Sequence, residues 1–182
     1  LVDEINEINH YRIFLRQGLY HMTIDSTAGY IKEANEHNFN EPVYLYEGKM
    51  MYQYDNLFSS YSVESDEYVA INKSQITNSV GQYVVERKDL LDRCLMNEWN
   101  YKWFFVYRNI TNTTNERTVI ASVIPFYAPV FSLRVMFGFE KEHSILFLAN
   151  MNSFALDFIV RNKMGGTNLS DYIMKQIPFI TI

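Results

Sequence analysis

Residues 103–125, WFFVYRNITNTTNERTVIASVIP, carry the clearest structural pattern of the chain. Lys102 to Tyr107 is almost entirely aromatic or β-branched, and Thr118 to Ile124 is rich in valine and isoleucine, with asparagine and threonine between the two runs. Aromatic and β-branched side chains favour strands, and a polar segment between two such runs is typical of a hairpin. The stretch therefore predicts two antiparallel strands in the middle of the chain.

Shorter or interrupted apolar runs indicate further strands at 43–46, 83–85 and 129–139. Residues 59–67 are polar and acidic, and we expect them to form a surface excursion of the same domain rather than a boundary. Most of the 14 tyrosines and 13 phenylalanines are expected to pack a β-rich core, because large aromatic rings bury much apolar surface.

Helical spacing is clearest toward the C-terminus. Arg87–Met96 places its leucines and Cys94 on one helical face, and 143–164 favours a helix with a break around 150–153. Gly165 is placed to take the left-handed conformation that ends many helices. Ser170 is placed to cap a short helix over 171–176, and residues 1–9 also show helical spacing. Together these patterns predict an α+β fold with a β-rich central sheet and helices toward the C-terminus.

Length and composition fit one globular domain covering residues 1–182. The single cysteine, Cys94, has no partner for an internal disulfide, and no apolar run is long enough to suggest a membrane span. We therefore expect a cytoplasmic protein without a membrane partner. The start at Leu1 and the apolar end suggest a piece excised from a longer protein.

Charge is distributed unevenly along the chain. The formal net charge is −5; residues 1–67 hold 12 acidic and 4 basic residues, and residues 68–182 hold 9 acidic and 12 basic residues. Phosphate contacts by lysine and arginine dominate nucleic-acid affinity. If the chain binds DNA, its DNA-facing surface is expected after position 68.

Several kinds of chemistry lack their usual motifs. The adjacent glycines, Gly165 and Gly166, follow a predicted helix rather than a strand, and no two prolines are adjacent, so neither a cofactor-binding glycine turn nor a Pro-Pro-aromatic loop is present. The four histidines lack metal-ligand spacing. We expect no catalytic residues, metal or cofactor in this chain. A pocket with carboxylates around Glu47 and Asp55 would favour an enzyme instead.

Four segments resemble one family. They are HMTIDS at 21–26, YEGKMMYQYDNLFSSY at 46–61, WFFVYRNITNTTNERTVIASVIP at 103–125 and LFLANMNSFALDFIVRNKMGGTNLSDYIMKQIP at 146–178. In this order they resemble the C-terminal target-recognition region, a TaqI-like specificity domain, of single-chain type II restriction-modification enzymes and of phage-exclusion (BREX) adenine methyltransferases. The chain departs from that pattern at Asn56-Leu57 and at Thr167 to Ser170.

The resemblance implies a function for the parent protein and for this part of it. The parent would be an S-adenosylmethionine-dependent adenine-N6 DNA methyltransferase, and it would have endonuclease activity if it belongs to the restriction-modification type. This chain would recognise double-stranded DNA in a sequence-specific way and position it for the methyltransferase domain of the same parent. The alternative is a protein-interaction scaffold that docks the catalytic domain or another subunit.

Candidate DNA contacts follow from the polar residues of the resembling segments. Asparagine and arginine pair with base edges, and exposed backbone at a glycine turn can approach a phosphate closely. The same side chains can instead organise loops through local hydrogen bonds, so both roles stay open. The candidates are Lys49, Gln53, Arg108, Asn109, Asn112, Thr113, Asn115, Arg117, Lys163, Gly165, Gly166, Thr167 and Asn168.

Overall fold

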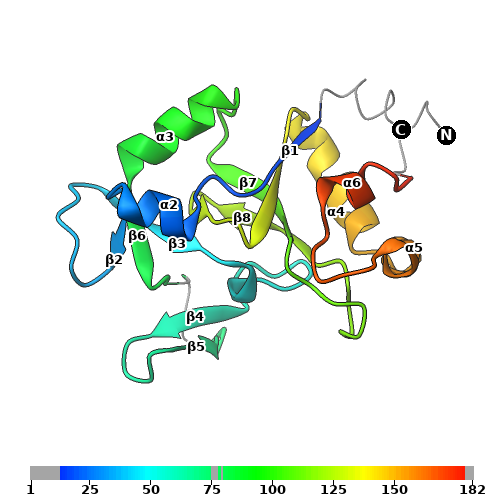
Figure 1. The fold of residues 1–182 in the computed structure, drawn as a ribbon, viewed down its shortest axis with the longest axis horizontal. Coiled ribbons are helices and arrows are strands. Elements are labelled where there is room, and N and C mark those ends of the chain that lie inside the picture. The colour runs from blue at the N-terminus through cyan, green and yellow to red at the C-terminus, as the bar shows by residue number, and fades with distance from the viewer. Residues whose placement is uncertain (1–12, 75–77, 79, 179–182) are drawn as a thin grey trace.

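The fold is α+β, as predicted, and was obtained as a computed structural model that describes residues 13–74, 78 and 80–178 (Figure 1). Its larger antiparallel sheet is built around the predicted hairpin, in which Trp103 pairs with Pro125 and Tyr107 with Ala121. Two further strands extend this sheet beyond β7. The order across the sheet is β1 (Phe14–Arg16), β10 (Leu133–Phe137), β7 (Trp103–Arg108) and β8 (Ala121–Pro125).

A second four-stranded sheet is assembled from segments distant in sequence. Its order is β2 (Ile31–Glu33), β6 (Tyr83–Glu86), β3 (Pro42–Tyr46) and β9 (Ala128–Pro129). β3 and β9 pair in parallel through Leu45 with Ala128 and Tyr46 with Pro129. Because β9 is followed closely by β10, this pairing holds the two sheets against each other.

The acidic stretch at 59–67 belongs to a small hairpin that projects from the main body (Figure 1). Its strands are β4 (Ser59–Ser62) and β5 (Glu67–Ala70), and the short helix η1 (Gly48–Met50) precedes it. Asp66 takes a positive φ of 55° in the turn between the strands.

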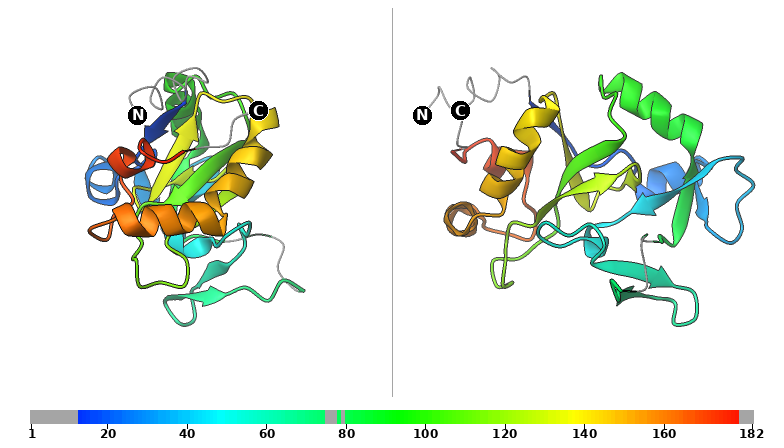
Figure 2. Two further views of the ribbon diagram at one scale, coloured as in Figure 1. Left: turned by 90° about the vertical axis from the view of Figure 1, so that its right-hand side faces the viewer. Right: turned by 180° about the vertical axis from the view of Figure 1, so that it is seen from behind.

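The helices lie at the two ends of the molecule (Figures 1 and 2). One end carries α2 (Met22–Thr27) and α3 (Arg87–Met96), and the other carries α4 (Ser144–Met151), α5 (Phe154–Lys163) and α6 (Asp171–Met174), with η2 (Lys141–His143) leading into α4. Among the described residues no single helix is long and apolar enough to cross a membrane, and the 141–151 and 154–163 helices reach that length only when joined across a 67° bend.

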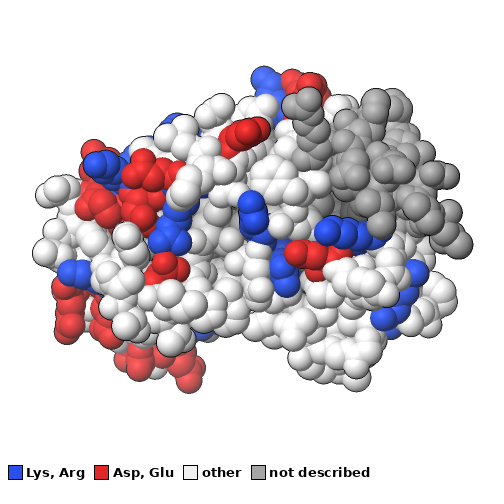
Figure 3. All heavy atoms as spheres, turned by 45° about the horizontal axis from the view of Figure 1, so that its top comes forward, with Lys and Arg blue, Asp and Glu red and all other residues white. Residues whose placement is uncertain are grey.

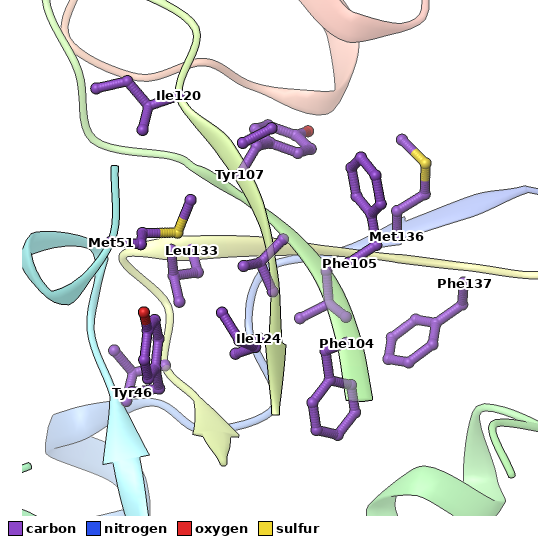
Figure 4. Packing of buried hydrophobic residues seen from close by; sticks show 14 of the residues in the cluster. Tyr46, Met51, Phe104, Phe105, Tyr107, Ile120, Ile124, Leu133, Met136 and Phe137 are labelled. Carbon is purple, nitrogen blue, oxygen red and sulfur yellow. The ribbon is translucent and has the colours of Figure 1, made fainter. Parts of the chain in front are cut away.

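The core includes residues of both four-stranded sheets and of α4 and α5, and Figure 4 shows its part around β7 and β8. Phe104, Phe105 and Tyr107 of β7 are fully buried, as are Tyr46 of β3 and Phe137 of β10. Fully burying one such side chain contributes roughly 1.5–3 kcal/mol. The central strand β7 therefore anchors the fold, which explains why its apolar pattern is nearly continuous.

From α3 onward the helix positions follow the sequence prediction closely, with one clear error, whereas α2 was not predicted. α3 has the predicted bounds, the break between α4 and α5 falls at residues 152–153, and α6 is shorter than predicted. The prediction for Gly165 was wrong: α5 ends at Lys163, Met164 occupies the C-cap with φ −86° and ψ 115°, and the described positive-φ residues do not include Gly165. The helix predicted for 1–9 lies outside the described residues.

Candidate functional site

The outer edge of β8 is where the resembling segments meet. Along β8, every second residue directs its backbone N–H and C=O groups away from β7. Side chains from other segments form hydrogen bonds with these groups. Gln53 Nε2 donates to the carbonyl of Val119 at 2.9 Å, and Asn56 Nδ2 donates to the carbonyl of Val123 at 3.1 Å. The side chain of Asn152, at the break between α4 and α5, bonds both the amide and the carbonyl of Ala121, at 3.0 and 2.9 Å. Side chains thus take the place of a neighbouring strand.

Asp157 of α5 continues this edge toward the hairpin loop. Its Oδ1 accepts from the amides of Thr118 and Val119 at 2.8 and 2.7 Å, which explains why β8 begins at Ala121 rather than at Thr118. Its Oδ2 accepts from Arg161 at 3.0 Å, and Oδ1 lies 3.6 Å from Nε of Arg117. The carboxylate is buried, so these contacts are strongly constrained.

Arg117, one of the candidate base readers, is therefore turned into the protein. It is 9% exposed, its Nη2 donates to the carbonyls of Asn152 and Ser153, and its guanidinium lies 4.4 Å from the ring centre of Phe154. Arg117 fixes the α4–α5 junction to the hairpin loop. This geometry matches the scaffold role that the sequence left open.

Arg108 holds the other side of the hairpin. It donates to the carbonyl of Gly48 at 2.6 Å and to that of Met51, and it makes no ion pair with an acid among the described residues. Burial lowers the pKa of its guanidinium. Arg108 thus ties the end of β7 to η1 by satisfying two loop carbonyls.

Two loops form a common rim beside α5, here called the loop pair: residues 109–117 and 163–168. The amide of Thr111 donates to the carbonyl of Thr167 at 3.0 Å, and that of Leu169 donates to the carbonyl of Asn109 at 2.7 Å. Arg161 of α5 holds the first of these loops and donates to the carbonyls of Thr113 and Glu116. The structure therefore joins two candidate clusters that are some 50 residues apart in the sequence.

The exposed part of the loop pair contains two glycines that the fold does not require. Gly165 and Gly166 are exposed, neither is among the positive-φ glycines, and a Cβ added at either would meet nothing within 4 Å. Gly48 and Gly81, in contrast, have backbone atoms within 3.3 and 2.4 Å of such a Cβ. A glycine that neither backbone conformation nor packing requires is typical of backbone that a ligand approaches closely.

The thirteen candidates fall into two groups by their contacts. One group uses its side chains to hold the protein together: Gln53, Arg108, Asn109, Asn112 and Arg117. The other group lies on the exposed or half-exposed surface: Lys49, Thr113, Asn115, Lys163, Gly165, Gly166, Thr167 and Asn168. Of this second group, only Lys49 lies outside the loop pair; it pairs with Glu47 at 3.2 Å and lies 3.9 Å from the ring centre of Tyr68.

Basic residues after position 68 are mostly neutralised. Of the twelve, seven form ion pairs with acids in the described part of the chain: Lys73, Arg87, Arg93, Arg117, Arg134, Lys141 and Arg161. On the face drawn in Figure 3, basic and acidic side chains alternate without a continuous basic patch among the described residues. Lys163 is the exposed lysine of the loop pair and has no acidic partner among them.

The two carboxylates considered as possible catalytic groups, Glu47 and Asp55, both form hydrogen bonds within the protein. Glu47 Oε1 accepts from the hydroxyl of Tyr68 at 2.6 Å, and Asp55 pairs with Lys73 and accepts from the amide of Leu57. Within the described ranges no group of three or more histidine, cysteine, aspartate or glutamate residues is placed to hold a metal ion.

Asn152 and Asp157 were not singled out from the sequence. Both lie in a segment whose helical pattern drew attention to its apolar residues. Two features of the sequence could have identified them: Asn152 is a polar residue at the predicted helix break, and Asp157 is a lone acid in an apolar helix. Because buried polar groups are usually hydrogen-bonded, either residue would be expected to bond another segment if it were buried.

Comparisons with protein-family models, curated proteins and solved structures gave no match.

Proposed function

We propose that this chain is the DNA-recognition module of a cytoplasmic adenine-N6 DNA methyltransferase or restriction-modification enzyme, and that it contacts duplex DNA through the loop pair. The parent would bind S-adenosylmethionine in a separate domain. In this proposal Thr113, Asn115 and Asn168 offer hydrogen bonds to bases or phosphates, and Lys163 contacts a phosphate. The candidates whose side chains hold the protein together do not read DNA in this proposal; they are Gln53, Arg108, Asn109, Asn112 and Arg117.

The observation that carries the proposal is the exposed pair Gly165 and Gly166 beside a polar loop. These glycines have open space around them and no strained backbone to accommodate. A side chain at either position would leave the fold intact but would obstruct a duplex lying on the rim.

Glycine substitution separates folding from binding. We expect Gly165→Gln/Gly166→Gln to keep or raise the melting temperature, because losing glycine restricts the unfolded chain by about 0.4–1 kcal/mol per site. The same variant should weaken binding to a fluorescent 30-base-pair duplex at least tenfold in low salt, measured by fluorescence anisotropy. Unchanged DNA affinity in a folded variant would argue against the loop pair as the contact surface.

A lysine pair provides the matched control. Lys163 and Lys88 are both exposed lysines, on α5 and α3 at opposite ends of the molecule. Lys163→Gln should weaken DNA binding and reduce the salt dependence by about one unit of slope, and Lys88→Gln should leave both unchanged. Equal effects of the two variants, or no detectable binding by the chain, would contradict the proposal.

A second candidate function has support from the α4–α5 surface. Between Ser144 and Val160 the one charged residue is Asp157, which is buried, while Ile145, Phe154 and Phe158 are 78%, 81% and 70% exposed. Exposed apolar surface of this kind marks sites of protein contact. A scaffold that docks a catalytic domain or another subunit would use this face, and it is compatible with DNA binding at the loop pair.

A further inference from the structure

A cavity of about 460 Å³ lies between the turn after β1 and helix α3. Helix α3 lies at the end of the molecule opposite to α5 (Figure 1). The volume of the cavity is in the range of small-molecule sites. The lining of the cavity combines charged, polar and apolar groups, among them Arg16, Tyr30, Asp89, Arg93, Met96 and Asn97. Neither the loop pair nor the α4–α5 surface includes any of these residues.

One side of the cavity is a fixed acidic network. Arg93 donates from Nε to Asp89 at 2.9 Å, from Nη2 to Asp25 at 2.7 Å and from Nη1 to the carbonyl of Leu19 at 2.5 Å. The hydroxyl of Tyr20 donates to the same oxygen of Asp89 at 2.7 Å. Two carboxylates thus surround one guanidinium, so this network has a formal charge of −1, and Asp89 is the carboxylate of the network that lines the cavity.

The other side carries a positive charge without an acidic partner. Arg16 Nε donates to Asn97 Oδ1 at 3.1 Å, and Asn97 Nδ2 donates in turn to the carbonyl of Arg93 at 2.8 Å. Arg16 forms no ion pair with an acid in the described part of the chain. An arginine held at Nε keeps its two Nη groups for a planar oxyanion, and a carboxylate matches that fork in shape.

Helix geometry fixes how far apart the two charges are. Asp89, Arg93 and Asn97 follow each other at four-residue spacing on one face of α3. Eight residues of helix rise about 12 Å, so Arg16, bound at Asn97, lies roughly that far along α3 from Asp89. This distance is too long for the ammonium and carboxylate of a single α-amino acid, but an extended peptide of three residues spans about 10 Å.

Apolar groups lie along the same cavity. Tyr30 is 47% exposed and Met96 is 74% exposed, although both line it. Methionine adapts its shape to different apolar side chains. The edge of the cavity at Tyr30 and Met96 therefore suits the aliphatic side chain of a ligand whose two ends are charged.

We propose that this cavity binds an extended zwitterion of tripeptide length, with its carboxylate on Arg16, its ammonium near Asp89 and an apolar side chain against Tyr30 and Met96. The site is independent of the proposed DNA recognition, because it lies at the other end of the molecule. A nucleotide with its phosphate on Arg16 fits the charge pattern less well, since its neutral base offers no cation to Asp89.

Calorimetric titration of the full chain with the peptide Ala-Leu-Ala tests the proposal. We expect a dissociation constant on the order of 1 mM, with binding at least tenfold weaker for the C-terminal amide and for the N-acetyl derivative. Each derivative removes one charge of the ligand and leaves the protein unchanged, so these arms do not depend on a variant that folds. Equal binding of the three peptides, no binding of Ala-Leu-Ala at 10 mM or tighter binding of adenosine monophosphate than of Ala-Leu-Ala would overturn it.

A variant pair locates the carboxylate contact. Arg16→Gln should weaken Ala-Leu-Ala binding at least tenfold and make the peptide and its amide bind alike. Lys88→Gln removes one positive charge from α3 but from outside the cavity, and it should leave the affinity within twofold of the wild-type value. Equal losses in the two variants would show general electrostatic attraction and would contradict the assigned site.

Discussion

Cys94 is a single thiol held in the core on the buried face of α3, which it shares with Leu90; Leu95, predicted on the same face, is 64% exposed. Cys94 is 2% exposed, and burial raises the pKa of its thiol from 9.0 to about 11. The cause is desolvation, because a thiolate in an apolar environment loses its hydration. Nearby Lys102 opposes this effect to a smaller extent.

The raised pKa of Cys94 predicts a pH dependence of stability. The folded state binds this proton more tightly than the unfolded state does, so the stabilisation is complete below pH 9 and is lost as the pH rises toward 11. The full loss is about 3 kcal/mol. Denaturant unfolding at pH 8 to 11 should therefore show a steeper decline for the wild-type protein than for Cys94→Ala.

The comparison with Cys94→Ala isolates the thiol from the tyrosines. Burial also raises the pKa values of Tyr46 and Tyr107, and these groups destabilise both proteins alike at high pH. Parallel curves for the two proteins would show that Cys94 ionises as freely in the folded state as in the unfolded state.

Individual site residues could be predicted from the sequence only as a set of polar candidates. Asn109, Asn112 and Arg117 carry the donors and acceptors expected of base readers, yet their side chains bond the protein itself. A guanidinium or an amide side chain can form hydrogen bonds with a backbone carbonyl as readily as with a base edge. The choice depends on which segment lies opposite, and for Arg117 that segment is the α4–α5 junction, 35 residues away.

At the scale of elements, the edge of β8 is closed by side chains from the α4–α5 region and from the loop after η1 instead of by another strand. An unpaired strand edge is a site where chains can aggregate. Asn152 covers Ala121 through both atoms of its side-chain amide, and Asp157 covers Thr118 and Val119. The α4–α5 junction therefore protects the sheet while it attaches the helices.

Removing the Asn152 side chain should destabilise the protein. Asn152→Ala leaves the buried amide of Ala121 without an acceptor, which costs about 1–3 kcal/mol. Asn162→Ala is the matched control, because among the described residues this exposed amide bonds only the carbonyl of Phe158 in its own helix. Urea unfolding should show the loss for Asn152→Ala and a change within about 0.5 kcal/mol for Asn162→Ala. Similar midpoints for both variants would show that the edge does not depend on Asn152.

The elements themselves were predictable where their contacts are local. The hairpin of β7 and β8, the bounds of α3 and the break before α5 all follow from periodicity and turn residues. The second sheet was not predictable in the same way. It depends on the parallel pairing of Leu45 with Ala128, and β9 is only two residues long, so its apolar pattern carries no information about its partner.

At the scale of the whole molecule, three distinct surfaces occupy separate positions. The loop pair and the α4–α5 surface share one end, as the left view of Figure 2 shows for the helices, and the cavity lies beside α3 at the other end. A partner domain bound to α4 and α5 would therefore lie beside bound DNA.

The apolar α4–α5 surface predicts self-association of the isolated chain. Ile145→Ser/Phe158→Ser should remain monomeric at concentrations where the wild-type chain forms larger species, as measured by sedimentation velocity, because both side chains are largely exposed. Val63→Ser is the control, since Val63 is 76% exposed on the β4–β5 hairpin. The prediction would be contradicted by a wild-type chain that stays monomeric at high concentration. It would also be contradicted if Val63→Ser reduced self-association as much as Ile145→Ser/Phe158→Ser does.

The pairing of β1 with β10 has a consequence for biosynthesis. Phe14 lies opposite Phe137, 123 positions later, so β1 cannot join its sheet until β10 has left the ribosome. At about 5–20 residues per second, translation of that interval takes on the order of 6–25 s. During this time the nascent chain can complete the β7–β8 hairpin but not the sheet that contains it, and a chaperone that binds extended apolar segments would have its longest opportunity at β1.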